Sequence, residues 1–319
     1  MTWTEAVVVS HSPATPDIAV IDLAPATGDE FPAYTAGAHI DVLITPNLVR
    51  QYSLCGPPEQ GRYRLAVLNE PASRGGSRAM HALKVGDHLR ISAPRNHFPL
   101  VTARRHLLFA GGIGITPLLA MARQLEREGG DYALHYCARS RARAAFVKEL
   151  AGNPRVALHF DDGDPRQQLD LARDLGDPQP DTAVYVCGPD GFMDHVLGKA
   201  EALGWPPQSL HKERFGTAPE PTASGDSFTV RLASTGAEYL VPDDRSVLDV
   251  LLENGVDAPY SCRQGICGTC VVRVLAGHPD HRDEVLTNEE HAEGLFTTCS
   301  SRSLSPTLKL DVIPRRDRP

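Results

Sequence analysis

Short runs of alternating apolar and polar residues fill the first part of the chain. The runs AVVVS, HIDVLI, QYSLCG, YRLAVL and DHLRISA are separated by Gly and Pro at close spacing. A period of two is typical of half-buried strands, and closely spaced short strands are typical of a small antiparallel barrel. The pattern therefore predicts an all-β domain over residues 1–101.

From His106 onward, apolar strands are each followed by a longer segment with helical periodicity. Three such pairs occur: HLLFAGG before TPLLAMARQLERE, DYALHYCA before RAAFVKEL, and AVYVCGP before GFMDHVLGKAEAL. Strand and helix in alternation indicate a parallel sheet with crossover helices. Residues 102–215 are therefore predicted to form an α/β domain.

A stretch without apolar periodicity, GTAPEPTASGD, occupies residues 216–226 and predicts a linker between domains. After it, SFTVRLA and EYLVP predict a hairpin, SVLDVLLENG predicts a helix that ends at its Gly, and TCVVRVLAG predicts another strand. Residues 227–319 are thus predicted to form a third domain that combines strands with a helix.

Composition limits the partners of these domains. The chain has 319 residues and a net charge of −8, and an acidic balance disfavours nucleic acid as the main partner. The longest charge-free apolar stretch, residues 107–122, is shorter than the roughly 20 residues that span a bilayer, and the N-terminus lacks a secretory pattern. We therefore expect a cytoplasmic protein that binds neither nucleic acid nor membrane.

Four cysteines carry the strongest chemical signal in the chain. Cys262, Cys267 and Cys270 have the spacing C-x4-C-x2-C, and Cys299 follows 29 residues after the third. This is the spacing of plant-type [2Fe–2S] ligands, and the glycines between the cysteines let the backbone curl around a cluster. Zinc is the alternative, although structural zinc sites prefer paired C-x2-C knuckles.

The nearby histidines have a simpler interpretation. His278, His281 and His291 stand among Asp and Glu residues, as on a solvated loop, so we predict no ligand role for them. Cys55 and Cys137 occur singly in apolar runs and are expected to be inert thiols.

A glycine-rich turn follows the first strand of the α/β domain. In LLFAGGIGITPLLAMA, Gly112 and Gly114 precede Thr116, the predicted helix cap, and Pro117 in the first helical turn. The unpaired N–H groups of a helix start suit a pyrophosphate. The turn departs from the pattern G-x-G-x-x-G, so a turn that merely packs a helix against a strand is the alternative.

The second strand of this domain leaves the choice of nucleotide open. It does not end in the acidic residue that would hold a ribose 2′-hydroxyl. It runs instead into Arg139, Ser140, Arg141 and Arg143, which either contact a 2′-phosphate and favour NADPH or form a solvated basic face.

Another strand of the α/β domain ends in Cys187, Gly188 and Pro189, before a predicted helix. Ligands of open α/β sheets bind at the carboxyl ends of the strands. The thiol could therefore line a nicotinamide pocket, whereas a structural turn would need only the Gly and the Pro.

Two segments of the predicted barrel suit a phosphorylated aromatic ligand. On the strand RQYSL, Arg50, Tyr52 and Ser53 present a cation, a ring and a hydroxyl group. The later segment SRGGSR is basic and glycine-rich and leads into AMHAL, as suits a single phosphate at a helix start.

Taken together, these motifs resemble those of the phthalate dioxygenase reductase family. RQYSL, the GGS segment, GGIGITP, CGP, KERF and SCRQGICGTC follow one another in the family's order along nearly the whole chain. The resemblance implies an antiparallel FMN-binding β-barrel, an α/β domain that binds NADH on a parallel sheet, and a C-terminal α+β ferredoxin domain of the plant type. It also implies a partner, a Rieske-type aromatic-ring oxygenase or O-demethylase.

The resemblance further implies roles for individual residues. The residues placed at hydride transfer are Ser53, Thr116, Cys187 and Phe215, which would cover the flavin ring. The residues placed around FMN are Arg50, Tyr52, Ser53, Val67, Leu68, Asn69, Gly75, Gly76, Ser77 and Arg78. The residues placed around the nucleotide are Gly112, Gly114, Thr116, Arg139, Gly188 and Pro189, and those placed on the cluster are Cys262, Cys267, Cys270 and Cys299.

The implied activity is that of an NADH-dependent oxidoreductase, which carries electrons from NADH through FMN to the [2Fe–2S] cluster. A reductase for another acceptor, such as a cytochrome or a diiron hydroxylase, is one alternative, and a non-catalytic redox sensor is another. A monomer is expected because one chain would carry every redox centre.

The distribution of charge suggests how the electron acceptor is recognised. Residues 226–314 carry 7 basic and 14 acidic side chains, whereas residues 1–225 carry 22 and 25. We hypothesise that an acidic face of the C-terminal domain docks transiently on a basic patch of the oxygenase.

Overall fold

The computed structural model describes residues 3–28, 30–45, 48–57, 61–71, 73, 75–215, 226–266, 268–283 and 285–312. Its described residues up to Phe215 form one compact unit, and those from Asp226 onward form another. The predicted linker, residues 216–226, lies outside the described residues except for Asp226.

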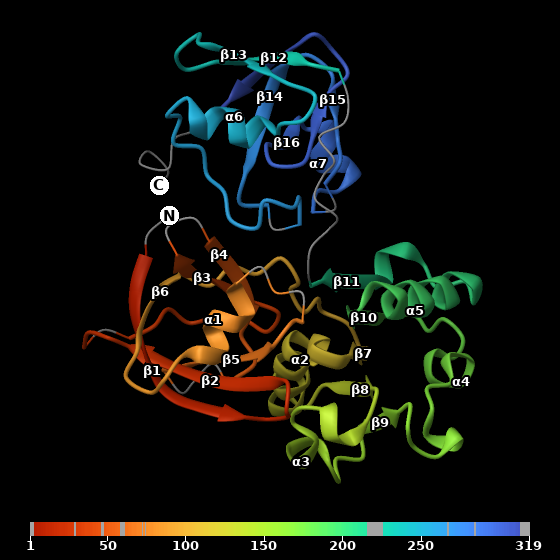
Figure 1. Cartoon of the computed structure of the whole chain (residues 1–319). Coiled ribbons are helices and arrows are strands. Elements are labelled where there is room, and N and C mark those ends of the chain that lie inside the picture. Colours follow the sequence, from red (N-terminus) through yellow and green to blue (C-terminus); the bar gives the residue numbers. More distant parts are fainter. Residues whose placement is uncertain are drawn as a thin grey trace. The chain divides into compact units, whose positions relative to one another are not determined.

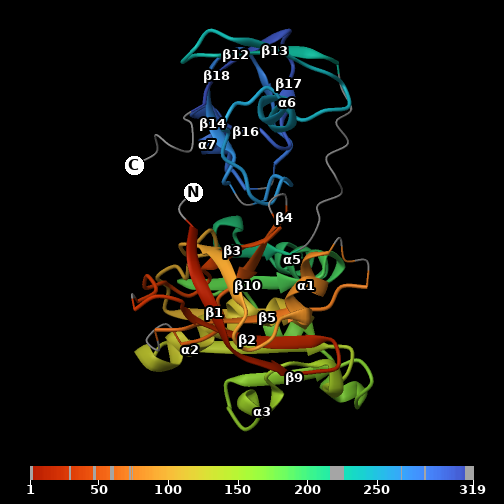
Figure 2. The same cartoon turned by 60° about the vertical axis from the view of Figure 1, so that its left-hand side comes forward.

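Six antiparallel strands form the barrel of the larger unit (Figure 1). They are hydrogen-bonded in the order β4-β3-β6-β1-β2-β5, and the two end strands contact each other. Figure 2 shows β1, β2 and β5 along one wall of the barrel. The elements are β1 (Trp3–Pro13), β2 (Ile18–Pro25), β3 (His39–Thr45), β4 (Leu48–Ser53), β5 (Tyr63–Leu68), α1 (Gly76–Ala82) and β6 (His88–Ser92).

The barrel core is built from alternate residues of these strands. Ile21 and Leu23 of β2 are buried together with Ile40 and Val42 of β3 and Leu65 of β5. Because successive side chains of a strand point to opposite faces, a period of two places every second residue inside. The predicted antiparallel barrel is confirmed, with one short helix, α1, added to its strands.

Five parallel strands follow, in the order β11-β10-β7-β8-β9. The chain passes from β7 to β8 and β9 in one direction and then crosses to β10 on the other side of β7, so the topological switch point lies between β7 and β10. The elements are β7 (Arg105–Gly111), α2 (Ile115–Glu128), β8 (Asp131–Ala138), α3 (Val147–Leu150), β9 (Val156–Phe160), α4 (Leu171–Leu175), β10 (Thr182–Gly188), α5 (Asp190–Ala202) and β11 (Leu210–Arg214).

Helices cover both faces of this parallel sheet. Leu108 of β7 packs in one core with Leu118 of α2, whereas its neighbour Phe109 packs in another with Met193 and Val196 of α5. Adjacent residues of one strand therefore supply two separate cores, as expected of a sheet buried on both faces. The predicted α/β architecture is confirmed.

The segment RAAFVKEL is a helix over a shorter range than predicted. Only Val147–Leu150 is helical, and Phe146 before it has a φ of 61°, which a continuing helix does not allow. Ala145 is buried in a small core with Cys55 and Ala66 of the barrel. Packing against the barrel therefore overrides the helical pattern of this segment.

The second unit contains a mixed sheet in the order β13-β12-β18-β14-β16 and a separate pair, β15 and β17. The predicted hairpin is formed by β12 and β13, and the predicted helix is α6, which Ser246 caps and which Gly255 follows at a φ of 75°. The elements are β12 (Phe228–Leu232), β13 (Glu238–Val241), α6 (Val247–Glu253), β14 (Val271–Ala276), β15 (Pro279–Asp280), α7 (Asn288–Ala292), β16 (Leu295–Thr297), β17 (Arg302–Ser303) and β18 (Thr307–Asp311).

Within the described part of the chain, no helix has both the length and the apolar character that a membrane crossing requires.

Candidate flavin, nucleotide and cluster sites

The carboxyl ends of β7 and β10 meet at the switch point through glycine. A β-carbon on Gly114 would lie 2.2 Å from the carbonyl oxygen of Cys187, and one on Gly188 would lie 2.9 Å from the α-carbon of Gly111. Side chains at these positions would collide with backbone atoms. The glycine turn after β7 and the CGP segment after β10 therefore form one continuous surface at the edge where such sheets bind ligands.

The helix after the glycine turn begins earlier than predicted, so the prediction that Thr116 caps it is wrong. A 3-10 turn over Gly112–Gly114 runs directly into α2, which begins at Ile115. Gly112 has a φ of 54°, which favours glycine. Thr116 is buried inside the first helical turn, where its hydroxyl donates to the carbonyl oxygen of Ile113 at 3.1 Å.

A buried acid that the sequence reasoning missed stands next to Cys187. Glu213 of β11 is the strand partner of Cys187. Burial raises the pKa of Glu213 to about 8, and burial together with this acid raises the pKa of the Cys187 thiol well above its ordinary range. Although the residue as a whole keeps partial exposure, its carboxyl Oε2 is buried without a hydrogen-bond partner in the described part of the chain.

The KERF motif contains Glu213, but the motif alone does not show that its strand pairs with the strand that ends in CGP. Had this pairing been known, an acidic residue beside Cys187 would have identified Glu213 as a candidate site residue. A neutral, buried carboxyl group beside a buried thiol is an arrangement that can hold a proton near a reacting nucleotide.

On the barrel side, the side chain of Arg50 lies across Gly76. A β-carbon on Gly76 would lie 2.6 Å from Cγ and 3.0 Å from Nε of Arg50, and the preceding Gly75 has a φ of 105°. The helix that begins here, α1, has only seven residues, so its own field is small. A phosphate bound here would therefore need a side-chain cation, and Arg50 is one that lies against this turn.

The other residues of this segment contact the loop before the helix. The backbone N–H of Glu70 donates to the hydroxyl of Ser77 at 3.2 Å, and the guanidinium of Arg78 donates to the carbonyl oxygen of Ser73. These bonds hold the glycine-rich loop closed onto α1.

The remaining flavin candidates lie on β4 and β5. Ser53 is buried at the end of β4, and burial raises the pKa of Tyr52 on the same strand. The side chain of Val67 is buried in the barrel core, so it faces away from any ligand, whereas Leu68 is partly buried in a different cluster. The N–H of Asn69 donates to the carbonyl oxygen of Asp17 at 2.8 Å.

The structure brings the two halves of this site together. Strand β5 contacts the Gly112–Gly114 turn. Phe215 directly follows β11 and packs against the core that contains Ile115 and Cys187. The barrel segments and the nucleotide turn therefore belong to one assembled region.

Two of the three arginines after β8 have side-chain partners within the protein. Arg143 forms an ion pair with Asp17 of the barrel at 3.0 Å, and the guanidinium of Arg141 lies 6.0 Å from the ring centre of Phe160. Arg139 follows the carboxyl end of β8, and its carbonyl oxygen accepts from the N–H of Asp162. Two of the three arginines are thus engaged within the protein.

In the second unit, three of the four predicted cluster cysteines lie close together; Cys267 lies outside the described residues. The N–H of Gln264 points at Sγ of Cys262 at 3.3 Å, and that of Gly265 points at Sγ of Cys299 at 3.2 Å. Cys270 and Cys299 have their sulfurs 3.2 Å apart. Backbone N–H groups aimed at thiolate sulfurs are what a [2Fe–2S] site requires.

The close approach of these thiols favours the binding of positively charged iron ions. Hydrogen bonds with Cys262 and Cys270 raise the pKa of Cys299, and the bond with Cys299 lowers the pKa of Cys270. Such sulfurs share protons that a bound metal centre would displace. The described donor set therefore fits the group that the spacing predicts.

Of the histidines near this loop, His291 is hydrogen-bonded to Asp283. The rings of His281 and His291 stack 3.8 Å apart, beside Asp283. One nitrogen of each ring and a carboxylate oxygen of Asp283 lie within 4.8 Å of one another. The geometry is that of a polar network, and we return to it below.

A second histidine pair, which the sequence reasoning missed, is buried in the α/β domain. His135 Nδ1 and His159 Nε2 are 3.1 Å apart with the ring planes 16° from parallel, and His159 Nδ1 donates to the Gln167 carbonyl oxygen at 2.7 Å. Burial lowers the pKa of His135 to about 4. One ring-to-ring hydrogen bond therefore joins β8 and β9.

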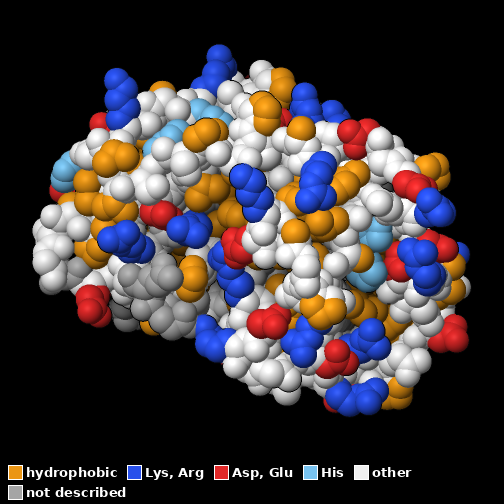
Figure 3. Space-filling view, turned by 90° about the horizontal axis from the view of Figure 1, so that it is seen from below, with side chains coloured by type: hydrophobic (Ala, Val, Ile, Leu, Met, Phe, Trp, Pro, Cys, Tyr) orange, Lys and Arg blue, Asp and Glu red, His pale blue; other side chains and the backbone are white. Residues whose placement is uncertain are grey.

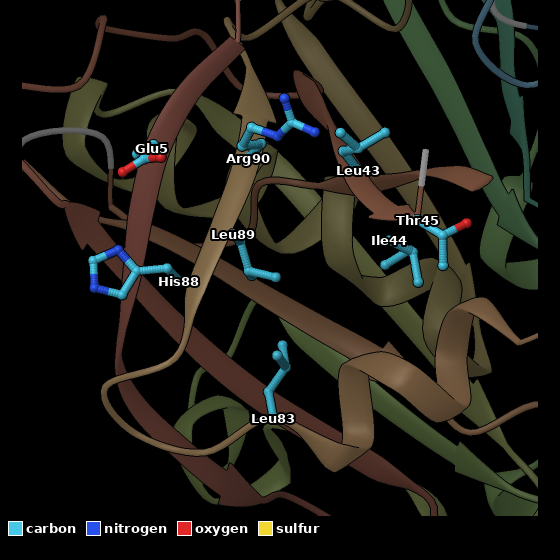
Figure 4. A pocket seen from close by; sticks show the side chains of 8 residues that line it. All are labelled: Glu5, Leu43, Ile44, Thr45, Leu83, His88, Leu89 and Arg90. Carbon is cyan, nitrogen blue, oxygen red and sulfur yellow. The ribbon is translucent and has the colours of Figure 1, made fainter. Parts of the chain in front are cut away.

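An open groove on the outside of the barrel has a volume of about 420 Å³ (Figure 4). It lies between β3 and β6 near the end of α1, and it shares no residue with the candidate flavin and nucleotide positions, so we assign it no part in the site. Its lining consists of Glu5, Leu43, Ile44, Thr45, Leu83, His88, Leu89 and Arg90.

Basic and acidic side chains are interspersed over the face shown in Figure 3, among hydrophobic and uncharged ones. A face that binds a phosphate backbone presents Lys and Arg without intervening carboxylates. The charge pattern on this face is therefore unlike that of a nucleic-acid-binding surface.

Comparison with known proteins identifies relatives along the whole chain. Residues 230–303 match the family described as 2Fe-2S iron-sulfur cluster binding domain. The chain is 51% identical over 316 residues to the vanillate O-demethylase oxidoreductase of Pseudomonas putida, covering 97% of this chain and 99% of that protein. It is 45% identical over 302 residues to the tert-butanol monooxygenase / tert-amyl alcohol desaturase reductase subunit of Aquincola tertiaricarbonis, covering 89% of each.

A solved structure matches over the same length. Phthalate dioxygenase reductase, described as a modular structure for electron transfer from pyridine nucleotides to [2Fe-2S], is 36% identical, covers 97% of this chain with 98% of its own, and superposes with a TM-score of 0.72. Since these matches extend over nearly every residue, the chain belongs to the phthalate dioxygenase reductase family of oxidoreductases, the components that supply electrons to oxygenases and O-demethylases.

Proposed function

We propose that this protein carries electrons from NADH through FMN and a [2Fe–2S] cluster to a Rieske-type aromatic oxygenase or O-demethylase. The observation that carries the proposal is the contact of β5 with the Gly112–Gly114 turn, which joins the flavin segment and the nucleotide segment in one compact unit. The cysteine loop of the other unit supplies the acceptor centre. Residues 1–101, 102–215 and 227–319 are the three functional domains, and residues 216–226 link the last two.

The barrel holds FMN. Arg50 faces the phosphate together with Gly75, Gly76, Ser77 and Arg78, while the ring lies near Tyr52 and Ser53 and the strand segment Val67–Asn69. The close packing of the Arg50 side chain on Gly76, which leaves no room for a β-carbon, supports this arrangement. Bound FMN would supply hydride acceptance and the release of single electrons, chemistry that the protein's own side chains lack.

The sheet edge between β7 and β10 holds the nucleotide. Gly112, Gly114, Gly188 and Pro189 offer backbone atoms to the pyrophosphate and the nicotinamide ribose, because they bear no side chain or a short one. Thr116 and Cys187 line the reacting end, and Phe215 covers the flavin ring until the nicotinamide displaces it. Glu213, whose pKa burial raises to about 8, lies beside them as the strand partner of Cys187.

NADH is the preferred nucleotide. Arg139 lies at the ribose end of the site, but Arg143 is paired with Asp17, which leaves less positive charge for a 2′-phosphate. The family resemblance points the same way.

Cys262, Cys267, Cys270 and Cys299 are the four cluster ligands. We further propose that the protein acts as a monomer, because one chain carries every redox centre, and that it works in the cytoplasm, where NADH is available and thiols stay reduced.

The proposal is tested by anaerobic titration of the purified protein with NADH, followed by absorbance, with the released flavin identified by mass. We expect the flavin and iron–sulfur bands to bleach together and FMN to be released. In the variant Cys270→Ser, NADH should bleach a flavin band alone. A colourless protein that holds zinc, or bands that do not respond to NADH, would contradict the proposal.

A further inference from the structure

Asp283 is a buried acid between the third and fourth cluster cysteines. Its side chain is 0% exposed. The N–H of Leu286 donates to its carboxylate at 3.0 Å, and the hydroxyl of Ser301 donates at 3.2 Å. Its neighbours present N–H and O–H donors, so both carboxyl oxygens of Asp283 serve as acceptors.

These bonds hold the turn that carries Cys299. Thr297 and Ser301 flank this cysteine, and both are buried. The hydroxyl of Thr297 lies 2.8 Å from that of Ser301 and 3.4 Å from the Asp283 carboxylate, and the N–H of Ser301 donates to the Thr297 carbonyl oxygen. Both ends of the turn are therefore tied to one carboxylate.

Asp283 also borders the loop that carries Cys262. A β-carbon on Gly265 would lie 2.5 Å from the hydroxyl of Ser300 and 3.2 Å from the α-carbon of Asp283. The N–H of Gly265 points at Sγ of Cys299. Asp283 thus sits where the two ligand-bearing segments of the chain pack against each other.

Two histidines shield this carboxylate from water. His291 Nε2 lies 3.2 Å from Oδ1 of Asp283, and the His281 ring stacks on His291. Thr297 of β16 and Ser301 of the turn also contact the carboxylate, which is 0% exposed.

We infer that Asp283 is a positioning residue for the [2Fe–2S] cluster, which fixes Cys299 through Thr297 and Ser301 and places a negative charge next to the cluster. The inference rests on the proposed function only in that a cluster is bound. In Asp283→Asn, an NH2 group replaces one of the two carboxylate oxygens, and an NH2 group cannot accept a hydrogen bond. The bond from either the Leu286 N–H or the Ser301 hydroxyl is therefore lost, and the turn loosens. The substitution would also remove the charge, which makes the cluster easier to reduce.

The test compares Asp283→Asn with Asp280→Asn in the full-length holoprotein. Asp280 is in the same loop, but its carboxylate is partly exposed and pairs with Arg282, so it serves as a matched control. Measured are iron per chain, the rate of cluster loss in a chelator, and the midpoint potential from a dithionite titration. Dithionite reduces the cluster directly, so the readout does not depend on NADH or flavin.

We expect Asp283→Asn to lose its cluster roughly tenfold faster than the wild type and to have a more positive midpoint potential, with flavin content unchanged. Asp280→Asn should match the wild type in both. Equal loss rates and equal potentials in the two variants would overturn the inference. A wild-type protein without a [2Fe–2S] signal would instead contradict the proposed function.

If Asp283→Asn does not fold, shown by loss of the circular dichroism of the C-terminal unit, Ser301→Ala carries the test. It removes one donor and leaves the carboxylate in place, so faster cluster loss is again expected, with the potential nearly unchanged. A loss rate equal to that of the wild type would overturn the inference.

Discussion

The carbonyl group of Cys187 packs directly onto Gly114, so the end of β10 and the turn after β7 share one surface. A β-carbon on Gly114 would lie 2.2 Å from this carbonyl oxygen. Because backbone atoms cannot yield as a flexible side chain can, Gly114→Ala should push the two strand ends apart. We expect NADH oxidation to fall roughly 100-fold, while dithionite still reduces flavin and cluster.

Gly198→Ala is the control for this prediction, since a β-carbon there meets nothing within 4 Å. Steady-state kinetics with NADH and an artificial electron acceptor would compare the two variants. Near-normal NADH oxidation in Gly114→Ala would show that the nucleotide does not use this surface.

The position of Arg50 across Gly76 predicts how the flavin phosphate is bound. Arg50→Gln should weaken FMN binding by about 2 kcal/mol, which is roughly 30-fold in Kd, because a charged hydrogen bond is lost. Riboflavin, which lacks the phosphate, should bind the variant and the wild type equally. Fluorescence titration of the flavin-free protein measures both ligands.

Arg90→Gln, an exposed arginine elsewhere on the barrel, is the matched control and should bind FMN normally. If Arg50→Gln weakened FMN and riboflavin to the same extent, Arg50 would not contact the phosphate.

The buried acid Glu213 predicts a pH dependence of stability. Its pKa is raised from an ordinary 4.5 to about 8, so between these values the folded state keeps a proton that the unfolded state has lost. The stabilisation is complete below pH 4.5 and is lost as the pH rises through 8. The melting temperature of the flavin-binding unit should therefore fall between pH 6 and pH 9, and Glu213→Gln should flatten this slope. Equal slopes in the two proteins would place the titrating group elsewhere.

The sequence predicted what depends on local pattern and on chemistry. Period-two runs predicted the barrel, strand and helix alternation predicted the parallel sheet, and the cysteine spacing predicted the cluster loop. What it did not predict depends on contacts across the fold. Ala145 leaves a helix to pack in the barrel, Thr116 is enclosed by a turn that runs into the helix, and Glu213 meets Cys187 through strand pairing.

The histidines of the α/β domain show the same limit. His135 and His159 are 24 residues apart and meet only because β8 and β9 are neighbours. Neither lies in a motif, so the sequence offers no signal for the pair.

A buried cation predicts where the C-terminal unit is most sensitive to substitution. Arg302 is 3% exposed, and its guanidinium donates to the carbonyl oxygens of Arg245, Pro242 and Asp226 at 2.7, 3.0 and 3.2 Å. Lysine cannot reproduce this planar fork, so Arg302→Lys should destabilise the unit by about 3 kcal/mol. The urea midpoint for bleaching of the cluster band measures the change.

Arg231→Lys is the control, because Arg231 is exposed on β12 and pairs loosely with Glu238 at 3.8 Å. It should change the free energy of unfolding by less than about 0.5 kcal/mol. Equal effects of the two substitutions would mean that the carbonyl contacts of Arg302 contribute no stability.

The acidity of the C-terminal domain predicts how electrons leave the protein. Residues 226–314 carry twice as many acidic as basic side chains, 14 against 7, so a basic patch on the oxygenase would be attracted over about a Debye length. Electron transfer to the oxygenase should therefore slow roughly tenfold between low and moderate salt. Reduction of a neutral quinone by NADH, which needs no charged partner, is measured in the same buffers and should hold constant. If oxygenase turnover proved as insensitive to salt as quinone reduction, the acidic residues would serve solubility and not docking.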